Sequence, residues 1–109
     1  MAGAFGAHAL RALVTPDRLD TWQTAAQYQL VHAAVLLALA AWLQLAPTRL
    51  RRWALRFFVA GICLFSGSLY LLVLLDKAWF GAVTPVGGVA LILAWGMLLV
   101  SAFREDTLN

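Results

Sequence analysis

The side chains that could move a proton or hold a ligand are few, and the most suggestive of them lie inside apolar sequence. His32 follows Tyr28 by four residues, so a helix places both on one face, one turn apart. An ionisable group at membrane depth is a candidate proton or ligand site, and imidazole is the side chain that titrates near neutral pH. Alternatively, His32 stays neutral and forms a hydrogen bond with a neighbour such as Tyr28. The sequence leaves both interpretations open.

Other polar residues fall at comparable depth and could extend this pair. Ser66 and Tyr70 lie four residues apart in a second apolar stretch, again on one helical face. Such groups could line a path for a small solute or a proton, or they could serve helix packing alone. The candidate polar line consists of His8, Gln27, Tyr28, His32, Ser66 and Tyr70.

No catalytic, cofactor or metal site is predicted. No acid lies inside an apolar stretch to pair with His32, and no spaced-glycine loop could cradle a phosphate. His8 and His32 without a carboxylate or thiolate make a poor metal site. The single cysteine, Cys63, allows no disulfide within one chain, and we expect it to be a buried apolar thiol. We therefore expect no enzymatic activity.

The elements that must position these side chains are marked out by the charges. Hydrophobic residues make up 63% of the chain and charged residues 12%, against roughly 45 to 50% and 25% in soluble domains. The mean hydropathy is +0.83. Uncharged stretches cover residues 21–48, 57–75 and 78–103, each near or above the ~20 residues that a membrane-spanning helix needs. This pattern predicts a protein of the lipid bilayer.

We predict an all-α integral membrane protein, an antiparallel helix bundle with three full spans and an N-terminal half helix. The whole chain, 1–109, forms one transmembrane domain. Thr15-Pro16 and Thr84-Pro85 are typical helix starts, and Pro47-Thr48 separates two spans. The half helix is expected at 1–13 and the spans at about 16–46, 49–75 and 85–104.

The distribution of arginines predicts the orientation. Arg49, Arg51, Arg52 and Arg56 occur with no acid among them, and positive charge of this kind marks a cytoplasmic loop. The C-terminus then also faces the cytoplasm. Topology accounts for half of the basic residues, and no basic patch with interleaved aromatic residues remains to indicate nucleic-acid binding.

Small residues on the second and third spans predict close helix packing. Gly61 and Ser68 lie seven residues apart on one face, and Gly87, Ala90 and Ala94 follow at spacings of three and four. Small side chains let helix backbones approach in lipid, where van der Waals contact and hydrogen bonds hold helices together. The partner could be a helix of the same chain, of a homo-oligomer or of another membrane protein. The predicted packing residues are Gly61, Gly67, Ser68, Gly87, Gly88, Ala90, Ala94 and Ser101.

Four stretches together resemble the YgdD family of small bacterial inner-membrane proteins, the domain-of-unknown-function family numbered 423. They are GAFGAHAL at 3–10, YQLVH at 28–32, FSGSLY at 65–70 and TPVGG at 84–88. The resemblance implies a four-helix protein of the bacterial plasma membrane with no established biochemical activity. Compared with that pattern, most of the first helix is missing. We expect a start codon placed too far downstream, because an even number of spans returns the N-terminus to the cytoplasm; the alternative is a true truncation.

Two functional hypotheses follow. The first is a non-enzymatic structural or partner-interacting helix bundle, indicated by the small-residue faces and the missing catalytic groups. The second is a component of a small-solute or proton transporter or channel, indicated by the polar line at membrane depth.

Overall fold

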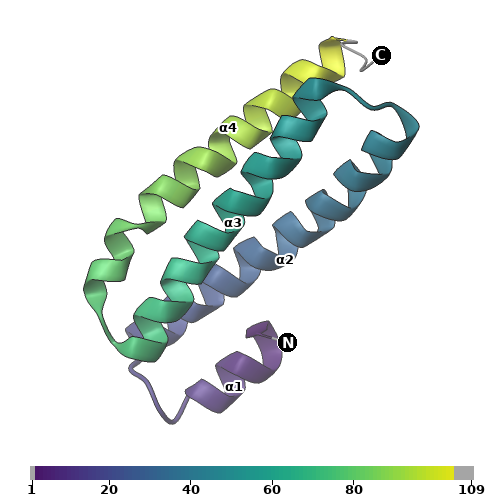
Figure 1. The fold of residues 1–109 in the computed structure, drawn as a ribbon. Helices are drawn as coiled ribbons and strands as arrows, with labels where there is room; N and C mark the ends of the chain where they lie inside the picture. The colour runs from purple at the N-terminus through teal and green to yellow at the C-terminus, as the bar shows by residue number, and fades with distance from the viewer. Residues whose placement is uncertain (1, 105–109) are drawn as a thin grey trace.

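A computed structural model describes residues 2–104 of the chain. Three long helices run antiparallel to their neighbours in sequence, namely α2 (Pro16–Leu45), α3 (Arg49–Leu75) and α4 (Thr84–Phe103) (Figure 1). A π-helical turn, η1 (Ala2–Gly6), continues into the short α1 (Ala7–Leu10) beside the first half of α2. Every element of the described residues is helical, which confirms the predicted all-α bundle of three spans and a short N-terminal helix.

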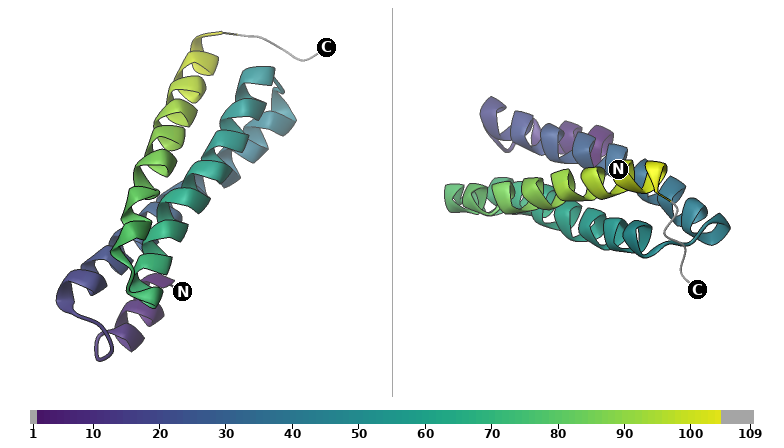
Figure 2. Two further views of the ribbon diagram at one scale, coloured as in Figure 1. Left: turned by 60° about the vertical axis from the view of Figure 1, so that its left-hand side comes forward. Right: turned by 90° about the horizontal axis from the view of Figure 1, so that it is seen from above.

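The three long helices have the length and composition of membrane spans. The candidate spans are Pro16–Leu45, Arg49–Leu75 and Ala78–Phe103. The molecule is an elongated rod (Figure 2). Its principal axes extend over 53 × 26 × 17 Å. On α2, Trp22 and Trp42 are separated by about 30 Å along the helix axis, the thickness of a hydrocarbon core. Tryptophan prefers the membrane interface, so the rest of this helix extends beyond the hydrocarbon.

The helix starts at Pro16 and Arg49 follow from the residues that precede them. Thr15 is extended, and its hydroxyl accepts a hydrogen bond from the Arg18 backbone N–H at 3.3 Å. Thr48 caps α3 in the same way, accepting from the Arg51 N–H at 3.0 Å. Each cap satisfies one of the backbone donors that a helix start leaves without a partner.

The start of α4 differs from the predicted threonine cap. A 3₁₀ turn, η2 (Ala78–Ala82), leads directly into the helix, and Val83 has helical backbone angles. The Val83 carbonyl accepts the N–H of Gly87, so the incoming turn already provides what a cap would supply. The Thr84 hydroxyl lies instead 2.6 Å from the Ser68 hydroxyl of α3.

A left-handed residue ends α3. Asp76 has φ 52° and ψ 44°, the conformation in which many helices terminate. Its carboxylate accepts a hydrogen bond from the Arg18 Nε at 3.3 Å, which joins the end of α3 to the beginning of α2. The pair is exposed to water and contributes little to stability.

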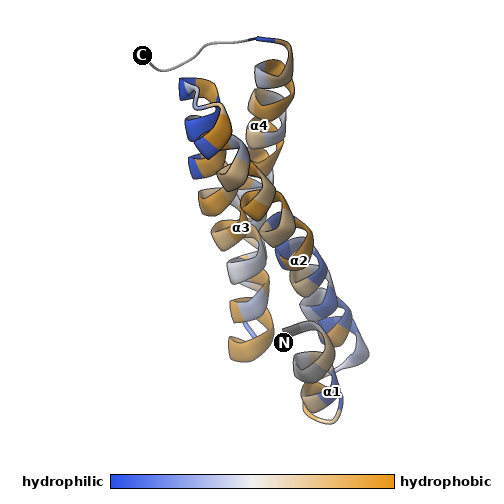
Figure 3. Ribbon diagram, turned by 90° about the vertical axis from the view of Figure 1, so that its right-hand side faces the viewer, coloured by the Kyte–Doolittle hydropathy of each residue, from blue (hydrophilic) through white to orange (hydrophobic). Residues whose placement is uncertain are grey.

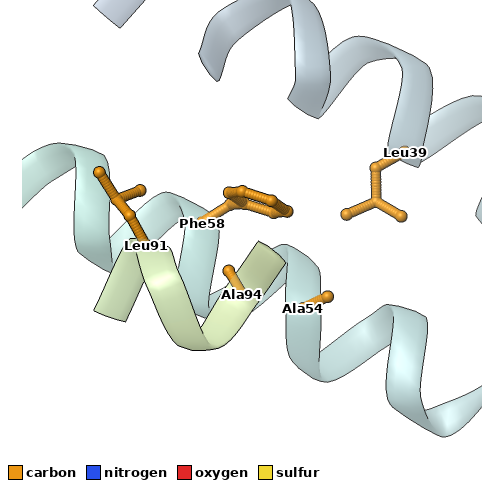
Figure 4. Close-up of a cluster of buried hydrophobic side chains, with 5 residues drawn as sticks. All are labelled: Leu39, Ala54, Phe58, Leu91 and Ala94. Atoms are coloured by element: carbon orange, nitrogen blue, oxygen red, sulfur yellow. The ribbon is translucent and has the colours of Figure 1, made fainter. Parts of the chain in front are cut away.

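The hydrophobic core lies between the three long helices, with α3 in the centre. Phe58 is fully buried and belongs to a cluster of side chains from all three helices (Figure 4). Cys63, expected to be buried, is exposed, because it lies on the side of α3 that faces away from α2 and α4. The members of the cluster are Leu39, Ala54, Phe58, Leu91 and Ala94.

Candidate functional site

His32 lies in the centre of the bundle with both ring nitrogens occupied. Its side chain is 5% exposed. Nδ1 is 2.8 Å from the Tyr28 carbonyl oxygen, and Nε2 accepts a hydrogen bond from Trp95 Nε1 at 3.2 Å. An indole N–H can only donate and a carbonyl can only accept. His32 is therefore neutral in this arrangement, with its proton on Nδ1.

Aromatic rings surround this histidine. The rings of Phe58 and Trp95 each lie 5.9 Å from the imidazole, and they meet each other edge to face at 5.1 Å. Tyr28 stacks along the imidazole at 6.0 Å and contacts Phe65 at 4.5 Å. We call these five residues the histidine cluster. It joins α2, α3 and α4 through packing and one side-chain hydrogen bond, with no acid facing the imidazole among the described residues.

Two further polar contacts connect α2 to α3. The Ser66 hydroxyl donates to the Ala25 carbonyl oxygen at 2.8 Å, and both residues are buried. The Tyr70 hydroxyl donates to the side-chain oxygen of Gln29. The Tyr70 ring also packs against the Trp22 ring, with 4.5 Å between the ring centres. Near the start of α2, the contact with α3 therefore consists of both aromatic packing and hydrogen bonds.

The contact between α3 and α4 is made by backbone approaching backbone. A Cβ atom added to Gly87 would overlap the backbone nitrogen of Phe65 and come within 2.9 Å of the Gly61 carbonyl oxygen. A Cβ at Gly61 would come within 2.9 Å of the Leu91 side chain and 3.0 Å of the Leu91 nitrogen. No real side chain fits at either position without separating the helices. These two glycines therefore set the distance between α3 and α4.

The other predicted packing residues divide between this contact and the outside. Ala94 is fully buried, and Ser68 and Ser101 are nearly so. A Cβ at Gly88 would reach only ordinary contact with Phe65, at 3.9 Å, and Ala90 is half-buried. A Cβ at Gly67 would meet no atom within 4 Å, so Gly67 makes no close approach in the described chain.

Arg51 joins the ends of all three long helices. Its side chain is 6% exposed; Nη1 donates to the Ala46 carbonyl after α2, and Nη2 donates to the Ser101 carbonyl of α4 at 3.2 Å. The guanidinium stacks 3.7 Å from the centre of the Trp42 ring. Positive charge at helix C-termini is favourable because the last carbonyls carry a partial negative charge. Arg51 thus neutralises two helix ends at once.

A groove of about 560 Å³ runs between η1 and α2. Gln23 and Gln27 face it from α2, and neither forms a hydrogen bond within residues 2–104. Figure 3 shows hydrophilic residues along this half of α2, outside the bundle. The lining residues are Gly3, Ala4, Gln23, Ala26, Gln27, Gln29, Leu30 and Ala33.

The residues of the candidate polar line occupy three separate places. Tyr28 and His32 belong to the histidine cluster, while Ser66 and Tyr70 contact α2 beside it. Gln27 faces the groove on the other side of α2. His8 is exposed on α1. The fold therefore brings Tyr28, His32, Ser66 and Tyr70 together. Gln27 and His8 lie apart from them and from each other.

Sequence reasoning missed three contributors. Trp95 was not among the candidate residues, yet an indole N–H at membrane depth needs an acceptor, and His32 provides it. Arg51 was grouped with the other loop arginines, although it shares its helical face with the core residues Ala54 and Phe58. The partner of Tyr70, Gln29, gave no signal, because that pairing depends on the register between two helices.

Comparison with known proteins identifies one family profile and several relatives that are named as membrane proteins. The sequence profile of a family described as protein of unknown function (DUF423) matches residues 2–88. The chain is 39% identical to the UPF0382 membrane protein SAB0533 of Staphylococcus aureus, covering 94% of this chain and 83% of that protein. It is 39% identical to the UPF0382 membrane protein YwdK of Bacillus subtilis, covering 94% and 84%.

A third relative is named as an inner membrane protein. The chain is 39% identical to the UPF0382 inner membrane protein YgdD of Escherichia coli, covering 94% of this chain and 78% of that protein. No solved structure matches the chain.

Proposed function

Since this chain belongs to the DUF423 family, whose relatives are named as membrane and inner membrane proteins, we propose that it is a non-enzymatic helix bundle that binds another membrane-spanning helix. The binding surface is the outer face of α2 along the groove. The protein acts in the bacterial plasma membrane as a structural or partner-binding component.

The observation that carries this proposal is the division of polar groups between inside and outside. Among residues 2–104, Arg51 Nε is the one buried side-chain nitrogen or oxygen without a hydrogen-bond partner. The imidazole of His32 and the hydroxyls of Ser66 and Ser68 are already bonded within the chain. The buried polar groups therefore stabilise the bundle. The polar groups on its exposed surface are the ones that can bind another helix.

The amides of Gln23 and Gln27 are such outer groups. They follow Trp22 within two turns of α2, at the border of the hydrocarbon, where an amide without a partner is unfavourable. Hydrogen bonds between membrane helices contribute about 0.6 to 2 kcal/mol each, and small neighbours such as Ala26 and Ala33 allow close approach. A helix with a polar residue of its own would satisfy both amides and cover the groove.

Photocross-linking in living cells tests this proposal. A photoreactive amino acid at Ala33 in the groove should give a cross-linked adduct with another protein. The same amino acid at Leu99, on the exposed side of α4, is the matched control and should not. The pair Gln23→Leu and Gln27→Leu should remove the adduct at Ala33. Equal adducts at both positions, or none at Ala33, would contradict the proposal, and co-expressed tagged copies distinguish a homo-oligomer from a different partner.

The proposed orientation places the connection between α2 and α3, together with the first turns of α3 that carry Arg49 to Arg56, on the cytoplasmic side, supported by its excess of positive charge. The expected cytoplasmic C-terminus lies outside the described residues. In a Cys63→Ala background, Lys77→Cys should react with a membrane-impermeant maleimide in spheroplasts. Pro47→Cys should react only after permeabilisation. The reverse pattern would invert the topology.

A component of a transporter or channel is the second candidate, and the amide-lined groove is the observation that favours it. Three glutamines beside a groove of about 560 Å³ could guide a small polar solute along α2. Reconstituted protein should then release trapped solutes or protons from vesicles, and Gln27→Leu should slow that release. Absence of any flux between pH 5 and pH 8 would reject this candidate while leaving helix binding intact.

A further inference from the structure

The first two turns of α3 have one face inside the bundle and one outside. Arg51 and Ala54 are buried against α2 and α4. The opposite side, at spacings of three, one and three residues, carries four exposed side chains. We call Arg49, Arg52, Trp53 and Arg56 the arginine face.

The arginine face has positive charge that the described chain does not neutralise. The acids of residues 2–104 are Asp17, Asp20 and Asp76, and all three lie at the opposite end of the bundle. Neither Arg49 nor Arg52 forms an ion pair within the described residues. Figure 3 shows this end of α3 as its most hydrophilic part, directly above a long hydrophobic section.

Trp53 places the arginine face at the membrane interface. Its ring is 51% exposed, and tryptophan rings prefer the depth of the lipid headgroups. The guanidinium of Arg56 lies over this ring, 4.8 Å from its centre. Stacking restricts the side chain without using its N–H donors, so the exposed Arg56 can offer them to a ligand at headgroup depth.

The same face of α3 continues into the hydrocarbon as a smooth strip. Ala60, Cys63 and Gly67 follow Arg56 at spacings of four, three and four residues. Ala60 and Cys63 are exposed, and a Cβ at Gly67 would meet no atom. An extended hydrocarbon chain could lie along this strip without displacing a side chain.

We propose that the arginine face binds the phosphate headgroup of an anionic phospholipid, with one acyl chain along Ala60, Cys63 and Gly67. Guanidinium groups bind phosphate oxygens through paired N–H donors, and basic clusters at the end of a membrane helix attract anionic lipids. Arg51 takes no part, because its two Nη atoms bond backbone carbonyls of α2 and α4. The lipid phosphate supplies acceptor oxygens for the guanidinium donors of the arginine face.

A second copy of the chain fits this face less well. Two α3 helices that met in parallel along the strip would bring Arg52 and Arg56 against their own counterparts. Like charges at that distance repel. An anionic lipid has the complementary charge and an acyl chain of the required shape.

Native mass spectrometry of the full chain, released from detergent with known lipids, tests the proposal. The probes are dioleoyl phosphatidylglycerol and dioleoyl phosphatidylcholine, which share acyl chains and differ in charge. The wild-type chain should retain phosphatidylglycerol preferentially. The double variant Arg52→Gln/Arg56→Gln should weaken that retention about tenfold and leave phosphatidylcholine unchanged.

The matched control is Arg11→Gln/Lys77→Gln, which removes two positive charges from the other end of the bundle. It should keep the preference for phosphatidylglycerol. Equal loss in both double variants would show an effect of net charge and overturn the proposal, as would a change of oligomeric state in the arginine variant, which would indicate a second copy.

The acyl-chain contact has its own test. A Cβ at Gly67 meets no atom of the described chain within 4 Å, so Gly67→Leu should leave the bundle folded while its side chain extends over the strip. It should weaken retention of phosphatidylglycerol severalfold. Water-soluble glycerol 3-phosphate should not displace the lipid, because it lacks the chain; displacement by it would overturn this part of the proposal.

Discussion

The two long-helix contacts of α3 are built on different principles. Toward α4, the glycines at 61 and 87 bring backbone against backbone, with buried alanine and serine filling what remains. Toward α2, aromatic rings and long polar side chains separate the helices, and single hydrogen bonds such as Ser66 to Ala25 fix the register. The first contact depends on the absence of side-chain volume, and the second depends on specific side-chain groups.

This difference determines which substitutions each helix contact tolerates. Backbone atoms cannot move aside, so added volume at the α3/α4 contact forces the helices apart. Rings and flexible side chains at the α2/α3 contact can shift, so added volume matters less there than a lost hydrogen bond. Substitutions that add volume or remove one bond can therefore distinguish the two contacts.

The largest effect is expected for Gly87→Leu. Its Cβ alone would overlap the backbone of α3, so α4 cannot remain docked. We expect a loss of about 3 kcal/mol or more in unfolding free energy, measured by reversible denaturation in mixed micelles. Gly96→Leu is the control, because a Cβ there meets no atom within 4 Å. If both variants are equally stable, α3 and α4 do not pack as described.

A smaller loss is expected for Arg51→Gln, which affects both contacts at one end. The change removes two charge-assisted bonds, to Ala46 and Ser101, and the stacking on Trp42. We expect about 2 kcal/mol, with only partial recovery in Arg51→Lys, because an ammonium group cannot span both carbonyls. Arg52→Gln removes the same charge from an exposed site and should change stability by less than about 0.5 kcal/mol. Similar losses at both positions would show that charge alone matters.

Ser66→Ala tests the α2/α3 contact by removing its buried hydroxyl. The Ala25 carbonyl loses one partner while the local volume hardly changes. We expect a loss of about 1 kcal/mol by the same denaturation assay. Ser66→Val restores bulk without the donor and should be no worse than Ser66→Ala if this contact tolerates volume. A much larger loss with valine would mean that α2 packs as tightly as α4 does.

The smallest effect is expected for Trp95→Phe. A smaller aromatic ring replaces the indole, and the donor to His32 Nε2 is lost. Stability should fall by less than about 1 kcal/mol. The sharper measurement is ¹⁵N NMR of the imidazole, which should show a single Nδ1–H tautomer in the wild type and a mixture in the variant. A mixture already present in the wild type would contradict the hydrogen bonds assigned to His32.

The sequence was sufficient for the fold class, because three long uncharged stretches allow little besides helices in a bilayer. It also indicated that Gly61 and Gly87 lie on faces of small residues, since spacing on a helix is a local property. The caps at Thr15 and Thr48 were predictable for the same reason.

Contacts that depend on the relative register of two helices were not predictable. Trp95 reaches His32 only because α3 holds α2 and α4 at one relative height, and no pattern within either helix encodes that height. Gly67 shows the converse problem. Its neighbours Ser66 and Ser68 face α2 and α4, and the glycine between them was grouped with the packing residues although it faces neither helix.

The bond from Arg51 to Ser101 has a consequence for biosynthesis. The two residues are 50 positions apart, and Ser101 belongs to the last turn of α4. While the ribosome is still translating α4, the Nη2 donor has no carbonyl to bond and must remain hydrated at the membrane surface. The three helices can thus be inserted one after another, but their common end can be secured only after α4 has been made.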